Sequence, residues 1–278
     1  VLLGLAYTAS FRDDFHWPIA IVTIVCALCM QIGTNYVNDY FDARSGVDDE
    51  KRLGPLRAIH LNLISAEQLQ KGYRVVFGAA FLLGLGLMWR GGLPIAIIGL
   101  SSLLLAYIYT AGPFPLSRNA LGELTALIYF GPLAVWGTIY LQDPTTSTLQ
   151  DPQVWTLGLG PGLISAAIMA INNLRDREND KIKNKKTLAV FLGEKGARQL
   201  CLSLIALSSL WALFYAWTSA LILPALASLV FLPFIKTWKN IYKAPIDREL
   251  NEAIAHTGKY LFAYSLFFSL TLLCATYV

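Results

Sequence analysis

The fold is decided by residues 17–42, which read WPIAIVTIVCALCMQIGTNYVNDYFD. The stretch from 17 to 38 is mostly apolar and long enough to cross a bilayer as one helix, which takes about 20 such residues. It ends in amides and carboxylates, at Asn35, Asn38, Asp39 and Asp42. We therefore expect a membrane span that carries clustered oxygen ligands where it leaves the membrane.

The composition extends this expectation to the whole chain. Its 278 residues are 55% hydrophobic and 14% charged, and the mean hydropathy is +0.52, whereas soluble domains average about 25% charged residues. Intrinsic disorder, a nucleic-acid-binding arm and a small disulfide scaffold are excluded, so no nucleic-acid partner is expected. The four cysteines lie inside apolar runs, which favours packing over disulfides or zinc. The sequence predicts an all-α integral membrane protein.

Apolar runs locate the expected helices. The candidate spans are 17–38, 74–90, 93–111, 121–141, 154–173, 198–217, 219–235 and 257–278. Residues 1–7 are apolar but too few to span, and they are interpreted as the end of a truncated first helix rather than as a signal peptide. This gives a bundle of about nine helices in a single domain, 1–278. The breaks at Gly91-Gly92 and at 217–219 predict tight hairpins between adjacent spans.

The charges are unevenly placed, although the net charge is only +4. All lysines and arginines except Arg12 and Arg90 fall in the loops after the second, fourth, sixth and eighth expected helices, or in the adjoining helix ends. Cytoplasmic loops of membrane proteins carry such an excess of cations. We therefore expect these loops, and the chemistry, on the cytoplasmic side of a bacterial inner membrane.

A second polar helix end lies at 172–180. Asn172, Asp176 and Asp180 follow one another at i, i+4 and i+8, within an arc of roughly 80°, and the polar residues of the first end share an arc of about 100°. Four crossings separate the two ends, so both open on the same side. Solvated helix ends are the simpler alternative. Against it, carboxylates at a helix C-terminus oppose the macrodipole, and buried Asn and Asp at membrane depth usually mark function.

Oxygen ligands on two facing helices suit a hard cation. Mg²⁺ binds through a few carboxylates and shares the rest of its shell with phosphate oxygens. The candidate ligands are Asn38, Asp39, Asp42, Asn172, Asp176 and Asp180. Cations on the adjoining loops are candidates for the remaining phosphate charge; they are Arg44, Lys51, Arg57, Arg118, Lys181 and Lys186. The run from Lys181 to Lys186 is open to a second interpretation, contact with anionic lipid.

These motifs resemble the two aspartate-rich motifs of the UbiA superfamily of intramembrane prenyltransferases. Within this superfamily, the sequence from about Asn35 to Arg198 resembles the 1,4-dihydroxy-2-naphthoate polyprenyltransferase (MenA) branch more closely. The segments that carry this are Gly54-Pro55-Leu56-Arg57, Ala106-Tyr107-x-Tyr109-Thr110, Asn172-Asn173-Leu174-Arg175-Asp176, Lys186-Thr187-Leu188-Ala189-Val190 and Leu192-Gly193-Glu194. Many members have a further Asp where this chain has Gly46, which leaves open whether Asp48 or Asp49 reaches the metal.

The resemblance implies transfer of a polyprenyl group from polyprenyl diphosphate to 1,4-dihydroxy-2-naphthoate, with Mg²⁺ as cofactor. The acceptor loses its carboxylate as carbon dioxide and becomes demethylmenaquinone. The residues implied to be catalytic are Asp39, Asp42, Asp176 and Asp180. Those implied to bind substrate are Asn35, Arg44, Arg57, Tyr107, Arg118, Arg175, Lys181 and Lys186. Arg175 and Arg44 are the candidate partners of the acceptor carboxylate, and the prenyl tail is expected to stay in the lipid bilayer.

Two further expectations concern the surroundings of the site. An allylic cation needs an electron-rich pocket, and the candidate aromatic residues are Tyr107, Tyr109, Tyr129, Phe130 and Trp136; packing and interface anchoring are the alternatives. Residues 57–64 are followed by Ser65-x-x-Gln68, a capping-box pattern. They are either an interfacial lid or a structural loop. His16, His60 and His256 are isolated and are not assigned to catalysis.

Three other functions stay open. A related prenyltransferase acting on 4-hydroxybenzoate, homogentisate or chlorophyllide has the same motif types. A transporter binds its substrate near the bilayer midplane, whereas the carboxylates here gather at helix ends on one side. A structural membrane scaffold is the third alternative.

Overall fold

The computed structural model describes residues 1–44, 53–55, 57–59, 61, 63–112 and 114–275, except the side chain of Arg44. Within these ranges all regular elements are helical. The helices are α1 (Leu2–Phe11), α2 (Trp17–Arg44), α3 (Ala66–Ile108), η1 (Leu116–Arg118), α4 (Gly122–Phe130), α5 (Pro132–Gln142), α6 (Thr146–Gln150), α7 (Pro152–Leu157), α8 (Leu159–Ile182), α9 (Leu188–Ser219), η2 (Leu223–Phe234), α10 (Ile235–Lys243) and α11 (Leu250–Ala275).

The chain is an integral membrane protein by the length and apolarity of its helices. In the described ranges, six helical stretches are long and apolar enough to cross a membrane. One of them, α3, bends at Gly92 into two halves, and α1 and η2 add shorter apolar segments. The prediction of about nine helices is confirmed for the described part of the chain. The outer surface carries large apolar side chains such as Trp89, 94% exposed from the protein, and Trp217, 78% exposed, as expected of a surface that faces lipid.

The predicted breaks lie close to where the backbone turns. Gly92 has φ 62 and ψ −150, a conformation that a residue without a side chain adopts readily, and Pro94 follows in the first turn of the next half. The predicted break at 217–219 is displaced slightly. There α9 continues through Ser219 and ends at Ala220, whose φ is 57.

Two predicted spans differ from the observed helices. The span at 219–235 is the 3₁₀ helix η2 rather than an α-helix, and it contains Pro224 and Pro233; proline lacks the N–H that an α-helix uses. The span at 121–141 is broken at Gly131 into α4 and α5. This break places Gly131 against α8, where a Cβ on it would lie 2.6 Å from Gly162 Cα, so the two backbones touch.

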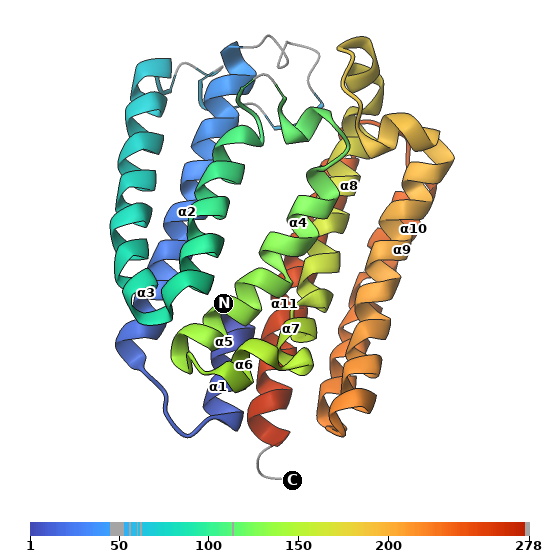
Figure 1. Cartoon of the computed structure of the whole chain (residues 1–278). Helices are drawn as coiled ribbons and strands as arrows, with labels where there is room; N and C mark the ends of the chain where they lie inside the picture. Colours follow the sequence, from blue (N-terminus) through green and yellow to red (C-terminus); the bar gives the residue numbers. More distant parts are fainter. Residues whose placement is uncertain (45–52, 56, 60, 62, 113, 276–278) are drawn as a thin grey trace.

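Both polar helix ends lie at the same end of the bundle (Figure 1). The C-terminal ends of α2 and α8 lie there, and so do the connections between α3 and α4 and between α10 and α11. At the opposite end, Arg90 donates to the carbonyl oxygens of Leu141 and Gln142, and Arg12 pairs with Asp143 and Asp151. The two cations that the charge pattern assigned to the other side therefore lie away from the polar helix ends.

Candidate active site

The first polar end is held by an arginine from outside its helix. Arg57 donates from Nη1 to Asp39 Oδ1 and from Nη2 to Asp42 Oδ2, the latter over 2.7 Å. Its side chain is only 12% exposed. Charge-assisted bonds of this kind are about twice as strong as neutral ones. Arg57, predicted as a phosphate ligand, thus bridges the two carboxylates that were predicted to bind metal.

The third ligand candidate on α2 meets the end of α3. The Thr110 hydroxyl donates to Asn38 Oδ1, and Thr110 is buried. One turn along α2, the Phe41 ring meets the Tyr107 ring edge-on, with centroids 5.5 Å apart. The segment Tyr107 to Thr110 therefore lies beside the first motif, as its predicted role in the site requires.

The second polar end is organised by Arg175, which is 3% exposed. Its guanidinium binds Asp176 through two hydrogen bonds, of 2.8 and 2.6 Å. The same group donates to Asn172 Oδ1 over 2.8 Å and to Asn251 Oδ1 over 2.7 Å. All three of its nitrogens are used by protein oxygens. This arrangement suits a residue that positions Asp176 rather than one that receives the acceptor carboxylate.

Asp180, the last carboxylate of the second motif, is within electrostatic range of the first motif. Asp180 is buried, and its Oδ1 lies 3.1 Å from Lys185 Nζ. Its charge interacts with those of Asp176 and, from α2, Asp42. Carboxylates from the two polar ends therefore lie within electrostatic range of each other.

A polar cavity of about 430 Å³ adjoins the first motif. Phe41 and Thr110 line it, and among the described residues Arg118 and Lys186 are its cations. The loops that carry the two cations are joined, because the Lys186 N–H donates to the Arg118 carbonyl over 2.9 Å. This cavity is suited to an anion.

The remaining predicted polar site residues either make no hydrogen bond or ion pair to the two motifs within the described ranges or lie outside those ranges. Asn35 and Lys181 are exposed from the protein, and no hydrogen bond or ion pair ties either side chain to the motifs within the described ranges. The Arg44 side chain, Asp48, Asp49, Lys51 and His60 lie outside the described residues.

The aromatic candidates divide into several groups. The Tyr109 hydroxyl contacts Met169 Sδ on α8, and the Tyr129 hydroxyl donates to Ser101 Oγ on α3. Phe130 is half exposed at the end of α4. Trp136 is 1% exposed and stacks on Tyr140 and Trp155. The suggestion that Trp136 faces a substrate cation is therefore wrong, because neighbouring rings bury its indole.

The oxygen donors at the two polar ends are of the kind that the predicted Mg²⁺ would bind. In the described residues, however, they are not gathered into a metal-binding cluster. Carboxylate and amide oxygens are the ligands that Mg²⁺ prefers, and both polar ends supply them. Within the described part of the chain, no three His, Cys, Asp or Glu side chains lie close enough together to hold an ion. Arg57, Arg175 and Lys185 neutralise the carboxylates instead. A metal site shared by both ends thus stays a prediction.

Two residues of this region were not predicted from the sequence. Glu123, in the first turn of α4, is 5% exposed; Asn173 Nδ2 donates to its Oε1 over 2.9 Å, and its buried Oε2 has no hydrogen-bond partner in the described chain. It is the single charged residue of the predicted span 121–141, which is a signal for function. Asn251 on α11 gave no comparable signal.

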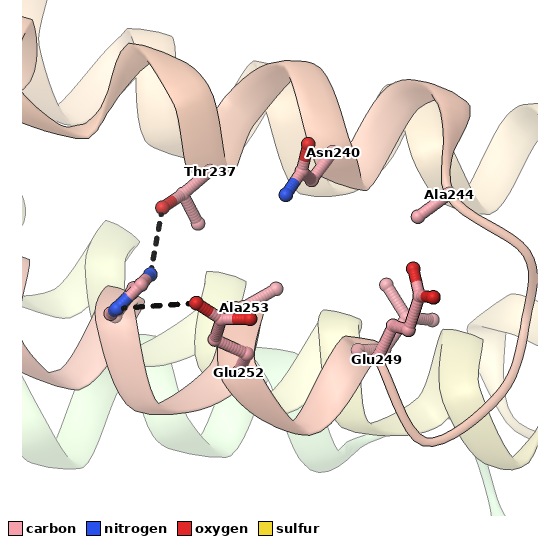
Figure 2. Close-up of a pocket in the computed structure, with 8 residues that line it drawn as sticks. Thr237, Asn240, Ala244, Glu249, Glu252 and Ala253 are labelled. Atoms are coloured by element: carbon pink, nitrogen blue, oxygen red, sulfur yellow. Dashed lines mark hydrogen bonds and ion pairs between the residues drawn. The ribbon is translucent and has the colours of Figure 1, made fainter.

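A second, smaller cavity of about 210 Å³ lies between α10 and α11. Across it, Thr237 Oγ1 lies 3.0 Å from His256 Nδ1, and Glu252 pairs with the same imidazole. Figure 2 shows Thr237 and Glu252 on opposite walls of the cavity. Asn240 and Glu249 also line it. It shares no lining residue with the cavity beside the first motif.

Comparison with known proteins identifies the family of this chain. The UbiA prenyltransferase family matches residues 1–275. The solved structure of a UbiA homolog from Aeropyrum pernix K1 matches with a TM-score of 0.68 at 17% identity, over 94% of this chain and 95% of that one. A UbiA homolog from Archaeoglobus fulgidus bound to GPP and Mg²⁺ matches with a TM-score of 0.63 at 12% identity, over 98% and 94%. The chain belongs to the UbiA prenyltransferase family.

Two relatives with named activities are similar to this chain over most of its length. The chain is 31% identical to the 1,4-dihydroxy-2-naphthoate octaprenyltransferase of Haemophilus influenzae, over 97% of this chain and 88% of the relative. It is 32% identical to the Escherichia coli protein of the same name, over 81% and 77%.

Proposed function

We propose that this protein transfers a polyprenyl group from polyprenyl diphosphate to 1,4-dihydroxy-2-naphthoate, releases carbon dioxide and forms demethylmenaquinol, the quinol form of demethylmenaquinone, for menaquinone synthesis. The observation that carries the proposal is that the acidic C-terminal ends of α2 and α8 lie at the same end of the bundle (Figure 1), where a cavity lined by Arg118 and Lys186 adjoins the first of them. The named relatives support the choice of acceptor. The family match over residues 1–275 supports a single functional domain.

The proposed reaction balances without an oxidant, because prenylation with loss of carbon dioxide leaves both hydroxyl groups in place and yields the quinol form of demethylmenaquinone. The bond between the prenyl carbon and the diphosphate oxygen breaks, and both electrons leave with the diphosphate. The acceptor ring supplies the electron pair of the new carbon–carbon bond. Its carboxylate leaves as carbon dioxide and returns its bonding pair to the ring. The site must therefore stabilise two negative charges: the growing charge on the diphosphate and the carboxylate of the acceptor.

Mg²⁺ is the proposed cofactor. When bound, it neutralises diphosphate charge and acts as a Lewis acid. The residues proposed to hold it are Asn38, Asp39, Asp42, Asn172, Asp176 and Asp180. Their donor set supports this role, as does the family member solved with GPP and Mg²⁺. Arg175 fixes the orientation of the Asp176 carboxylate through two hydrogen bonds.

The diphosphate is proposed to meet cations from three loops. Arg118 and Lys186 line the polar cavity, and Arg57 lies on Asp39 and Asp42 beside it. Preorganised cations aimed at developing charge stabilise a transition state strongly. Lys181 is assigned to the outer edge of the same site.

The organic part of the reaction is proposed to lie on the lipid side of these charges. The Phe41 and Tyr107 rings are in contact at the edge of the first motif, and Tyr107 is 40% exposed. Their faces are proposed to stabilise the allylic cation. Asn35, about one turn deeper on α2, is assigned to the prenyl end of the substrate, whose tail stays in lipid.

The site is proposed to open to the cytoplasm of a bacterial cell, from its inner membrane. The support is the cation pattern, with Arg12 and Arg90 alone at the other end of the bundle. Cytoplasmic placement gives the site access to charged, water-soluble substrates and ions.

A comparison of acceptors tests the function. Purified protein in detergent receives Mg²⁺, a polyprenyl diphosphate and one of three acceptors: 1,4-dihydroxy-2-naphthoate labelled in its carboxyl group, 4-hydroxybenzoate or homogentisate. We expect prenylated product and labelled carbon dioxide with the naphthoate. Faster prenylation of either other acceptor overturns the substrate assignment, and no prenylation of any acceptor overturns the activity.

A further inference from the structure

Asn251 makes two long-range hydrogen bonds from opposite ends of its amide. Its Oδ1 accepts from Arg175 Nη1 over 2.7 Å, and its Nδ2 donates to the Leu53 carbonyl over 2.8 Å. The second bond joins residues 198 positions apart in the chain. A neutral amide is the side chain that offers a donor and an acceptor together in this way.

The two partners lead to the two polar helix ends. Arg175 binds Asp176 and Asn172 of the second motif. Leu53 precedes, by four residues, the arginine that bridges the carboxylates of the first motif. A path of hydrogen bonds thus runs from Asp176 through Arg175 and Asn251 to Leu53, which lies four positions before Arg57 in the sequence.

The position of Asn251 on α11 does not require this side chain. Its backbone N–H already donates to the Arg248 carbonyl over 3.0 Å, so its amide is not needed to start the helix. The helix itself is held by buried apolar and aromatic residues, among them Tyr260, Tyr264 and Phe268. The side-chain amide is therefore available to bind Arg175 on α8 and the Leu53 carbonyl near Arg57 in the sequence.

We propose that Asn251 is a positioning residue that ties the two halves of the diphosphate site together. By holding Arg175 with one atom and the Leu53 carbonyl with the other, it keeps the arginine of the first motif at a fixed place relative to the second motif. The kinetic part of this inference rests on the proposed function; the structural tie does not.

Asn251→Asp separates the two contacts. The carboxylate still accepts from Arg175, but it has no donor for Leu53 and repels that carbonyl. Asn251→Leu removes both contacts. Asn240→Leu is the matched control, since Asn240 is an exposed asparagine on neighbouring α10 and belongs to neither motif.

The first measurement needs no substrate and no metal. Trypsin is added to the protein in detergent, and cutting after Arg57 is followed by mass spectrometry. The side chain of Arg57 is 12% exposed and ion-paired, so the wild-type protein is cut slowly there. Loss of one hydrogen bond corresponds to about a fivefold change, and we expect cutting to accelerate by about that factor in Asn251→Asp and by more in Asn251→Leu. Asn240→Leu is expected to match the wild type.

The second measurement is steady-state prenyl transfer. In Asn251→Asp we expect the KM for polyprenyl diphosphate to rise about fivefold while kcat stays within a factor of two to three, because ground-state positioning is lost and the reacting groups remain. Wild-type cutting together with a wild-type KM overturns the proposal, and so does a fall in kcat alone. If the wild-type protein transfers no prenyl group, the proposed function fails, and the trypsin result still decides whether Asn251 holds the Leu53 segment.

Discussion

Arg57 and Arg175 each bind the carboxylates of one motif, and they do so in different ways. Arg57 bridges Asp39 and Asp42 with two nitrogens, whereas Arg175 forms a two-bond fork with Asp176 alone. A buried guanidinium needs such partners, because an unpaired charge at this depth is very costly. The arginines thus keep two acidic helix ends stable in the absence of bound cations.

Replacing Arg175 by lysine tests the importance of the fork. A lysine keeps the charge but cannot bind a carboxylate through two parallel bonds. We expect Arg175→Lys to lower the free energy of unfolding by about 1–3 kcal/mol and to weaken turnover, measured by thermal unfolding and product formation in detergent. Arg177→Lys, where the arginine pairs with the exposed Glu178, serves as the control. Equal behaviour of the two variants would contradict the role of Arg175.

Glu123 provides a second test at the residue scale. Asn173 donates to one of its oxygens in a buried environment. Glu123→Gln keeps an oxygen for Asn173, whereas Glu123→Leu leaves the amide unsatisfied, at a cost of about 1–3 kcal/mol. We expect Glu123→Leu to unfold at a clearly lower temperature than Glu123→Gln. Similar unfolding temperatures of the two variants would show that the contact is unimportant.

The residues that sequence reasoning found share a local signal, and those it missed do not. Asp39, Asp42, Asp176 and Asp180 stand out because carboxylates are rare beside apolar spans. The pairing of Arg57 with Asp39 was not predictable, since it depends on how a loop returns to its helix. Asn251 was missed for the same reason, because its partners lie on α8 and at Leu53, far away in the chain.

At the scale of helices, three glycines set how closely α4 and α5 approach α8. A Cβ on Gly162 would lie 2.5 Å from the Leu127 carbonyl oxygen, and one on Gly158 would lie 2.5 Å from Gly131. Gly158 and Gly162 are four residues apart, the small-residue spacing that lets membrane helices pack closely. This contact fixes the position of α8, whose C-terminal end carries the second motif.

Gly162→Ala is therefore expected to disturb the bundle. The added methyl group would collide with backbone atoms that have little freedom to move, at a cost of about 1–3 kcal/mol. Gly86→Ala is the matched control, because a Cβ there meets nothing within 4 Å. Thermal unfolding in detergent measures both. A Gly162→Ala protein as stable as Gly86→Ala would contradict the close approach of the helices.

Helix existence was more predictable than helix type. Apolar length predicted the spans, and Gly91-Gly92 predicted the turn inside α3, because glycine adopts a positive φ readily. The predicted capping box at Ser65 and Gln68 is confirmed, with both reciprocal bonds present. The break at Gly131 depends on packing against α8, which periodicity does not report. The 3₁₀ form of η2 follows from Pro224 and Pro233, which a count of apolar residues overlooks.

At the scale of the whole molecule, charge separates the two ends of the bundle. The polar helix ends, the cationic loops and the larger cavity share one end, and Arg12 and Arg90 bind carboxylates and carbonyl groups at the other. For the described residues, the end of the bundle at which the cations lie was readable from the sequence, since it needs only the order of spans and loops. Which of those cations contact the motifs required the three-dimensional structure.

Labelling of single cysteines tests the orientation. In a variant without the four native cysteines, Pro55→Cys lies at the motif end and Thr146→Cys at the opposite end, both at exposed positions. We expect a membrane-impermeant maleimide to label Thr146→Cys in intact cells and Pro55→Cys only after permeabilisation. The reverse pattern would place the site outside the cytoplasm.

Whether the two acidic helix ends act as a single unit is tested most directly by a double-mutant cycle on prenyl transfer in the presence of Mg²⁺. Asp39→Asn and Asp176→Asn are measured singly and together, with Glu178→Gln, an exposed carboxylate on α8, as the control. If both ends hold one diphosphate site, each single variant loses about 100-fold or more in kcat/KM, and the double variant loses little beyond the worse single one. A double variant whose loss equals the product of the two single losses, or a single variant with full activity, would contradict the account.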